Sequence, residues 1–323
     1  MVTLPSASLL GALAARHGGV VDAGAEALTV AALAPVATAV DGQLTPLLSR
    51  RRAYVEAARA TAAAVLVDAE LASLVPAGRR WVHAHAGFVL AELLRSAAPP
   101  PPPDARAAAH VDPGASVDPT ASVGPGAVIL AGARIGPGTR IEPNAVIYGG
   151  SVIGARVLVG AGAVVGRPGF GWTAAPDGDG VVRVPQLGGV RIEDDAEIGP
   201  LATVDAGTLG PTVIGRGAKL DAHVHVGHNA EVGAGVMVAA QAGFAGSVII
   251  GAGALVGGQA GVADHVHVGA GARLAGKAGV IGDVEAGAAV AGYPAVARER
   301  WLRAAAHALH ESDPEQRRRR RST

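Results

Sequence analysis

Three of the eleven histidines of the chain lie within six residues, in the stretch LDAHVHVGHNAEVG. They are His223, His225 and His228, and clustered histidines can bind a metal ion or accept protons. An imidazole can take a proton from an attacking nucleophile near neutral pH, and a backbone N–H group can stabilise the oxyanion that forms on a carbonyl. Whether these groups can act together depends on the elements that hold them.

Those elements follow from a six-residue repeat of apolar side chains. An apolar residue recurs at every sixth position from Val111 to Val165, resumes at Ile192, shifts by four residues near the segment TLGP, and continues from Ile214 to Val280. The residue two places earlier is usually small and apolar, so both face inward in an extended segment. This pattern predicts a mainly β fold, a left-handed parallel β-helix in which three hexads close a coil of about 18 residues.

The repeats suffice for about eight coils, which at the spacing of paired strands make a prism on the order of 40 Å long. Its flat faces favour assembly around a three-fold axis, so we expect a homotrimer.

On this β-helix the first two histidines are predicted to point outward from one strand, whereas His228 lies near a corner. Eighteen residues later, on the adjacent coil, Gly246 leaves its backbone N–H accessible. His265 lies about two coils along the same edge, and Asp221 lies on an adjoining face, from which it could orient an imidazole of its own or a neighbouring subunit. Together these groups favour general-base attack on a carbonyl.

Two further regions flank the predicted β-helix, and one interrupts it. We predict a small α/β domain over residues 1–98 and a proline-rich linker over 99–110, with Pro99 to Pro103. The β-helix is predicted over residues 111–290, with a loop inserted at 167–189. Residues 291–323 are predicted to form a helix from about Pro294 and an arginine-rich tail. Within the first domain we expect an opening helix capped near Ser6 or Ser8 and a buried strand at Val65 to Val67.

Composition excludes several classes of chemistry. The chain has 323 residues, 3% aromatic residues and no cysteine, so disulfides, thiolate nucleophiles and cysteine-bound zinc are excluded. No apolar run reaches the roughly 18 residues that span a bilayer, which predicts a soluble cytoplasmic protein. The formal net charge is zero, and no nucleic-acid partner is expected. The run Arg317 to Arg321 is either a solvated tail or a site that attracts an acidic partner or anionic lipid.

Longer motifs make a family resemblance specific. The segments GFGW, VPQLGGVRIEDDAEIGPLATVDAGTLGPTVIGRGAKLDAHVHVGHNAEVG and AAQAGFAGSVIIGAGALVGGQAGVADHVHVG resemble the core of the UDP-3-O-acylglucosamine N-acyltransferase family of lipid A biosynthesis. GQLTPLLSRRRAYVEAARATAAAVLV resembles its uridine-binding domain, and GYPAVARERWLR the entry to its C-terminal helices. The resemblance implies a homotrimer with sites between subunits, no metal or other cofactor, and transfer of a hydroxyacyl chain from acyl carrier protein to the glucosamine 2-amine.

The resemblance also implies roles for individual residues. His228 matches the general base, Asp221 its supporting acid, and Gly246 the oxyanion N–H. His265 and Gln259 match the region that receives the carrier's pantetheine arm. The residues matched to binding of the UDP-sugar are Phe170, Trp172, Gln186, Asn229, Ser49 and Tyr54. The mechanism implied is direct attack on the thioester without a covalent enzyme intermediate.

The chain departs from the family pattern at several positions. Pro46 and Ser49 stand where the family usually has a Phe that stacks on uracil and an Asn, and Tyr54 is displaced from the expected spacing. Ala206 replaces an Arg and Ala222 an Asn. These departures leave open a related enzyme that acts on another amino-sugar nucleotide.

Three other readings remain open. A trimeric zinc carbonic anhydrase could use His223 and His228 as ligands from adjacent chains, but no histidine occurs between Val111 and Asp221 where a further ligand is expected. A sugar acetyltransferase would keep the base and use acetyl-coenzyme A. A binding module would keep the fold without catalysis.

Overall fold

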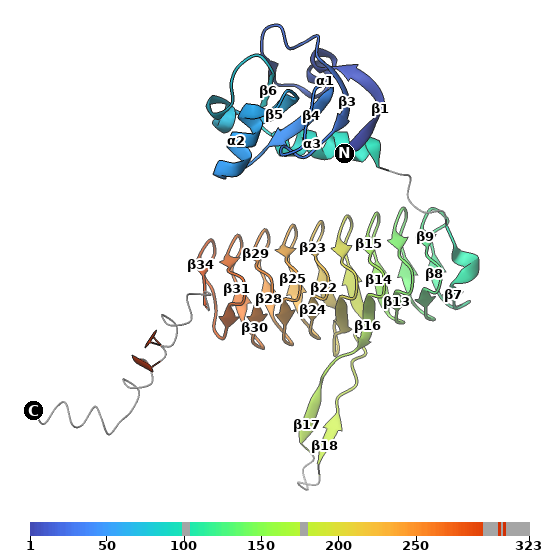
Figure 1. The fold of residues 1–323 in the computed structure, drawn as a ribbon. Coiled ribbons are helices and arrows are strands. Elements are labelled where there is room, and N and C mark those ends of the chain that lie inside the picture. Colours follow the sequence, from blue (N-terminus) through green and yellow to red (C-terminus); the bar gives the residue numbers. More distant parts are fainter. Residues whose placement is uncertain (99–103, 175–179, 293–302, 305, 308–323) are drawn as a thin grey trace, which may run out of the picture. The chain divides into compact units, whose positions relative to one another are not determined.

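The computed structural model describes residues 1–98, 104–174, 180–292, 303–304 and 306–307. The chain divides into two compact units, Met1–Pro101 and Pro102–Thr323 (Figure 1). The helix predicted from about Pro294 falls largely outside the described residues, although 303–304 and 306–307 are helical, and the Arg317 to Arg321 run lies wholly outside them. No described helix is long and apolar enough to cross a membrane.

The first unit is a mixed six-stranded sheet with helices. Its strand order is β1-β3-β4-β5-β6-β2, with β3 to β6 parallel and both outer pairs antiparallel. The elements are β1 Val2–Leu9, α1 Leu10–His17, β2 Val20–Val21, β3 Thr29–Leu33, β4 Gln43–Leu47, α2 Arg52–Ala60, β5 Ala64–Asp68, the 3₁₀ helix Ala69–Leu74, β6 Arg80–His83 and α3 Ala86–Ala97.

In this unit the strand predicted from buried apolar residues is confirmed, whereas the helix start predicted from capping residues is wrong. The buried strand expected at Val65 to Val67 is confirmed, because β5 is fully buried over these residues. The expected cap at Ser6 or Ser8 is wrong, because both lie in β1, which pairs with β3, and α1 begins only at Leu10 without a side-chain cap. Strand pairing here overrides the local capping preference of serine.

The second unit is a left-handed parallel β-helix with three faces, which confirms the predicted fold class (Figure 1). The first face has β7 His110–Val111, β10 Val128–Ile129, β13 Val146–Ile147, β16 Val164–Pro168, β21 Thr203–Ala206, β24 His225–Val226, β27 Gly243–Phe244, β30 Gly261–Val262 and β33 Gly279–Val280. The second has β8 Ser116–Val117, β11 Arg134–Ile135, β14 Ser151–Ile153, β19 Val190–Ile192, β22 Thr212–Ile214, β25 Glu231–Val232, β28 Ile249–Ile250 and β31 His267–Val268. The third has β9 Ser122–Val123, β12 Arg140–Ile141, β15 Leu158–Val159, β20 Glu197–Ile198, β23 Lys219–Leu220, β26 Met237–Val238, β29 Leu255–Val256, β32 Arg273–Leu274 and β34 Ala289–Val290.

The repeat is explained by what each hexad buries. Residues eighteen apart pair between coils, as Val128 does with Val146, so equivalent side chains stack. The apolar residue of each hexad and the small residue two places before it fill the interior, as Val226 and Val224 do without exposed area. Small side chains in a narrow prism therefore form one continuous core.

The three edges of the prism differ in the residues at their left-handed corners. We name them the His228 edge, between the first and second faces; the glycine edge, between the second and third; and the Asp221 edge, between the third and first. From β22 onward the glycine edge carries only glycine at positive φ, at Gly217, Gly235, Gly253, Gly271 and Gly287. In the same coils the other two edges carry side chains there, namely Asn229, Ser247 and His265 on the His228 edge, and His223, Gln241, Gln259 and Lys277 on the Asp221 edge.

Two interruptions of the repeat lie side by side. The segment predicted as an inserted loop is a hairpin, with β17 Trp172–Ala174 antiparallel to β18 Val181–Arg183. The predicted four-residue shift is a bulge at residues 207–211, because Thr203 pairs with His225, four residues later than the usual spacing. Backbone hydrogen bonds join the two, from Leu187 N to Thr208 O at 3.0 Å and from Gly188 N to Gly207 O at 2.8 Å.

Candidate active site

The three clustered histidines do not share one surface. His225 lies on β24, and its Nδ1 is 2.7 Å from the Thr203 hydroxyl. His228 follows at the corner of the His228 edge. The prediction that His223 points outward from the same strand as His225 is wrong, because His223 lies at a corner of the Asp221 edge with φ 59°. Two of the three therefore sit close to each other, and the third belongs to another edge.

Gly246 lies directly against the imidazole of His228. A Cβ atom placed on Gly246 would be 2.6 Å from Cε1 and 2.8 Å from Nε2 of the ring. The missing side chain therefore makes room for the imidazole as well as exposing the backbone. Among the described residues no backbone carbonyl accepts the Gly246 N–H, while the adjacent Ser247 N–H donates to His228 O at 2.8 Å.

On its other side the ring is covered by the start of the hairpin. A Cβ atom on Gly169 would be 2.9 Å from His228 Cβ, 3.1 Å from its Cδ2 and 3.1 Å from Asp205 Oδ2. His228 is thus held between Gly169 of the hairpin and Gly246 of the next coil. Glycine at both positions lets two backbone segments approach one ring.

A hydrogen-bonded chain ties His228 to the bulge and the hairpin. Asn229 Nδ2 is 3.0 Å from His228 Nδ1 and donates to the Thr208 hydroxyl at 2.9 Å, while Asn229 Oδ1 accepts the Thr208 N–H at 2.6 Å. The Thr208 hydroxyl donates to Gln186 Oε1 at 2.7 Å. Gln186 is buried, with 6% of its surface exposed, whereas Thr208, Asn229 and His228 are partly exposed, so the chain is shielded from water at its Gln186 end. Thr208 is a residue that the sequence analysis did not identify.

Asp205 is a second residue that the sequence analysis missed. Its side chain is 1% exposed; its Oδ1 lies 3.0 Å from Arg167 Nε, and its Oδ2 lies 3.8 Å from His225 Nε2. Neither oxygen has a well-aligned hydrogen bond among the described residues. Burial raises the pKa of the Asp205 carboxyl, against the opposing effects of His225, Arg167 and His228. Burial likewise lowers the pKa of His225, against the effect of Asp205.

The sequence did contain a signal for Asp205. It follows the inward-facing Val204 directly, as Asp221 follows Leu220, and most hexads place a small residue at this position. Asp112, Asp118, Glu142 and Glu193 also follow an inward-facing residue directly, so the repeat alone does not say which carboxylate is near His228. The structure places Asp205 on the first face beside His225, and it places Asp221 on the Asp221 edge.

Within one chain Asp221 and Gln259 are separated from His228. Gln259 donates to Gln241 at 2.6 Å in a stack along the Asp221 edge. His265, by contrast, lies on the His228 edge, where its N–H donates to Gly246 O at 3.1 Å. The predicted site residues therefore fall on two edges of the prism, with Asp221 and Gln259 on one and His228, Asn229, Gly246 and His265 on the other.

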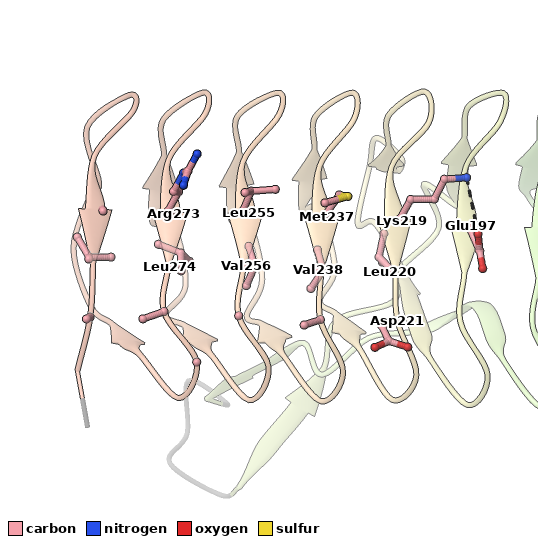
Figure 2. A pocket seen from close by; sticks show the side chains of 17 residues that line it. Glu197, Lys219, Leu220, Asp221, Met237, Val238, Leu255, Val256, Arg273 and Leu274 are labelled. Carbon is pink, nitrogen blue, oxygen red and sulfur yellow. Dashed lines mark ion pairs between the residues drawn. The ribbon is translucent and has the colours of Figure 1, made fainter. Parts of the chain in front are cut away.

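An apolar groove of about 720 Å³ lies on the third face (Figure 2). Met237, Leu255 and the stem of Arg273 project from successive strands, and Asp221 lies at the border of the groove (Figure 2). Met237 is 53% exposed in the single chain. The groove is on a different face from His228, and it has the apolar lining that an alkyl chain or another protein surface requires.

The hairpin presents the aromatic residues predicted to bind substrate. Phe170 is 81% and Trp172 is 42% exposed, with ring centroids 6.4 Å apart in an edge-to-face arrangement. The Arg183 guanidinium lies 4.7 Å from the Trp172 ring, and this cation–π contact orients the indole. Gly169 lies against His228, and Phe170 is the next residue in the chain. The aromatic pair therefore begins beside the candidate base.

Ser49 and Tyr54 lie in the first unit, which is described separately. The Ser49 hydroxyl accepts the Arg51 N–H at 3.3 Å just before α2, and Tyr54 on that helix is 44% exposed. A pocket of about 540 Å³ lies close by in sequence, lined by Leu48, Arg50, Asp68, Ala69, Glu70, Leu71 and Ala84, without either residue. Among the described residues, no group of three or more His, Asp or Glu side chains is arranged to hold a metal ion.

Comparison with known proteins agrees with the hexapeptide repeat. Residues 132–167 and 211–246 match the family described as bacterial transferase hexapeptide (six repeats). The UDP-3-O-acylglucosamine N-acyltransferases of Anaeromyxobacter dehalogenans (strain 2CP-C) and Myxococcus xanthus are each 55% identical to the chain, over 152 and 151 residues. These matches cover 46% of this chain and 43% of each relative, so the chain spans less than half the length of the relatives it matches.

Solved structures show the same architecture. A UDP-N-acetylglucosamine O-acyltransferase from Moraxella catarrhalis RH4 superposes with a TM-score of 0.54 and 25% identity, covering 61% of this chain and 76% of that one. The UDP-N-acetylglucosamine acyltransferase of Francisella novicida gives 0.53 and 26%, covering 61% and 71%. The chain thus carries a left-handed β-helix of bacterial transferase hexapeptide repeats and, over nearly half its length, resembles the UDP-3-O-acylglucosamine N-acyltransferases.

Proposed function

We propose that the protein is an N-acyltransferase of lipid A biosynthesis, which moves a 3-hydroxyacyl chain from acyl carrier protein to the 2-amine of UDP-3-O-acylglucosamine. The observation that carries the proposal is His228, held between Gly169 and Gly246 in a repeat shared with enzymes of that name. An imidazole next to a backbone N–H with no backbone acceptor is what acyl transfer to an amine requires.

In the proposed reaction the amine attacks the thioester carbonyl directly. His228 takes the proton that the amine loses, and the Gly246 N–H stabilises the oxyanion of the tetrahedral intermediate. When the carbon–sulfur bond breaks, the imidazolium returns the proton to the leaving thiolate. Atoms balance without a covalent enzyme intermediate, and the proposal includes no cofactor beyond the phosphopantetheine arm of the carrier.

Substrate contacts follow from the elements around His228. The hairpin with Phe170 and Trp172 is proposed to cover the sugar, and the exposed edge at His265 to receive the pantetheine arm. Ser49 and Tyr54 are proposed to contribute to nucleotide binding in the first unit. The apolar groove that Met237 lines supports the burial of an acyl chain or of a neighbouring subunit.

The separation of Asp221 and Gln259 from His228 supports a homotrimer with shared sites. If the Asp221 edge of one subunit faces the His228 edge of the next, Asp221 and Gln259 can complete a site that a single chain leaves without them. We further propose a cytoplasmic location, and contact of the Arg317 to Arg321 tail with the acidic carrier or with anionic lipid.

The test is a mass-spectrometric assay of the purified full chain with UDP-3-O-acylglucosamine and hydroxyacyl carrier proteins of several lengths. We expect the wild type to form an N-acylated product. The rate of product formation should fall by a factor on the order of 10³ in His228→Gln and stay unchanged in His110→Gln. His110 is a control because it is an exposed histidine on β7, at the far end of the sheet that contains β24. Equal product from His228→Gln contradicts the assignment of the base.

The same assay tests a second acceptor. Because Pro46 and Ser49 depart from the family pattern, other amino-sugar nucleotides are included as acceptors, and acetyl-coenzyme A as a donor. Product with one of these and none with UDP-3-O-acylglucosamine would identify a related transferase with the same base. No product from any pair, with a folded protein, would favour a binding module.

A further inference from the structure

The hydrogen-bonded chain at His228 has only one possible direction. Gln186 Nε2 donates to the Val184 carbonyl at 3.1 Å, so Gln186 Oε1 faces Thr208 and accepts its hydroxyl. The backbone N–H of Thr208 can only donate, and it lies 2.6 Å from Asn229 Oδ1. Backbone groups therefore fix both side-chain amides, and the Asn229 Nδ2 group must face the ring of His228.

This direction determines which ring nitrogen of His228 carries hydrogen. The Asn229 Nδ2 group has two hydrogens and no lone pair to offer, so one hydrogen goes to the Thr208 hydroxyl and the other to Nδ1. A neutral imidazole that accepts at Nδ1 carries its hydrogen on Nε2. We infer that Thr208 is a positioning residue that, through Asn229, holds His228 in the Nε2–H tautomer and couples it to the hairpin through Gln186.

The bulge gives Thr208 this position. It adds four residues to the coil that contains β21, and Thr208 O accepts the Leu187 N–H of the hairpin at 3.0 Å. A Cβ atom on the preceding Gly207 would be 2.0 Å from the Gly210 carbonyl oxygen and 3.0 Å from Asn229 Oδ1, so glycine is needed for the bulge to fold back on itself beside Asn229. A regular 18-residue coil has no residue at this place. The irregularity of the repeat therefore serves the site.

The inference rests on the proposed function for its consequence in catalysis. In the Nε2–H tautomer the one lone pair of the imidazole is on Nδ1, and the Asn229 amide covers it. To accept the proton of the attacking amine at Nδ1, the ring must first be released by Asn229. The Thr208 hydroxyl, which holds the same Nδ2 group, then keeps the amide in place and limits the movement.

The primary test reads the tautomer and needs no activity. Full-length protein with ¹⁵N-labelled histidine is studied by two-bond ¹H–¹⁵N correlation at mildly alkaline pH, and the His228 signals are assigned by their loss in His228→Gln. We expect a protonated Nε2 and an unprotonated Nδ1 in the wild type, a mixture of tautomers in Thr208→Val, and the wild-type pattern in Thr208→Ser. A protonated Nδ1 in the wild type, or an unchanged pattern in Thr208→Val, overturns the inference.

A matched variant and kinetics separate positioning from stability. Thr139 is a threonine of the β-helix that is buried, whereas Thr208 is partly exposed; the Thr139 hydroxyl, like that of Thr208, both donates and accepts, donating to Gly154 O at 2.8 Å and accepting the Val157 N–H at 3.0 Å. Thr139→Val should lower stability without changing the His228 signals. Because Thr208→Val loosens the Asn229 amide that covers the lone pair of His228, we expect kcat to rise roughly tenfold with KM changed by less than about twofold, and Thr208→Ser to return kcat to the wild-type value. If no acyl donor gives product, the proposed function fails, while the tautomer result still decides this inference.

Discussion

At the scale of single residues, the site is built from glycines that admit a ring and from one carboxylate that burial disfavours. Gly169 and Gly246 lie on either side of His228, and Asp205 lies beneath the hairpin with Arg167 and His225. A buried carboxylate with two poorly bonded oxygens is unfavourable for folding. Groups of this kind are expected where function, rather than stability, determines the residue.

Gly246→Ala tests the contact with the ring. The added methyl would lie 2.6 Å from His228 Cε1, so the imidazole must move. We expect kcat to fall by a factor on the order of 100, since displacement of a catalytic group by about 1 Å has effects of that size. Gly261→Ala is the control, because a Cβ atom there meets nothing within 4 Å. Similar losses in both variants would show that the effect comes from the backbone and not from the ring.

Asp205→Asn tests the burial of charge through its pH dependence. The pKa of Asp205 is raised above 3.8, so its contribution to stability is present below pH 3.8 and is lost as pH rises through the folded-state pKa. Replacement by a neutral amide removes this loss. We therefore expect the variant to gain free energy of unfolding relative to the wild type as pH rises from acidic to neutral, measured by urea denaturation.

His225 must be considered in the same experiment. Its pKa is lowered from 6.5, so its contribution has the opposite sign: it is present above pH 6.5 and is lost as pH falls through the folded-state pKa. Comparing Asp205→Asn with the double variant Asp205→Asn/His225→Gln separates the pH-dependent contribution of Asp205 to stability from that of His225. A variant whose stability relative to the wild type falls with rising pH would contradict the burial argument.

At the scale of elements, the hairpin and the bulge act as one unit. The Gly188 N–H donates to the Gly207 carbonyl, and a Cβ atom on Gly188 would overlap the Gly210 carbonyl. Gly188→Ala should therefore shift the bulge, lower stability by about 2 kcal/mol and change kcat in the same direction as Thr208→Val, because Thr208 moves with the bulge. Gly210→Ala, in the same bulge but in open space, should change neither. Thermal unfolding and the acyl-transfer assay measure both effects.

The sequence predicts the structure of the regular elements. For the irregular elements, the hairpin and the bulge, it predicts only their position in the chain. Hexads such as Val224 and Val226 have one stable solution, because burying both requires a coil of fixed length. The shift near TLGP was visible as a break in the period, but its shape depends on the hydrogen bonds to Gly188 and Leu187, which are distant in sequence. Thr208 could not be found for that reason. The same limit explains β1, where pairing with β3 decided the structure of Ser6 and Ser8.

At the scale of the whole β-helix, the three edges differ in the residues that they carry at their corners. Corners at positive φ disfavour side chains, so the side chains kept on the His228 and Asp221 edges are retained at a cost of about 1 kcal/mol each. From β22 onward the glycine edge avoids that cost. We infer that chemistry and recognition are confined to two edges, which accords with the distribution of His228, His265, Asp221 and Gln259.

Gly253→Ala tests this division on the glycine edge. Its φ is +68° and a Cβ atom meets nothing within 4 Å, so only backbone strain is added. We expect a loss of about 1 kcal/mol and a fall in Tm of roughly 3 °C, with unchanged acyl transfer. Gly253→Asn, which tolerates this backbone better, should lose less. Loss of activity in a folded Gly253→Ala protein would show that the glycine edge takes part in function.

The eighteen-residue register of stacked coils has a consequence for how such a protein can change. Asn229 and His265 occupy equivalent corners two coils apart, at about 4.8 Å per coil. Duplicating or removing residues 247–264, a complete coil that excludes Gly246, would move His265 relative to His228 by a single step while every side chain kept its direction. The spacing between His228 and His265 can therefore be altered only in steps, and each step taken beyond Gly246 leaves the geometry around His228 intact.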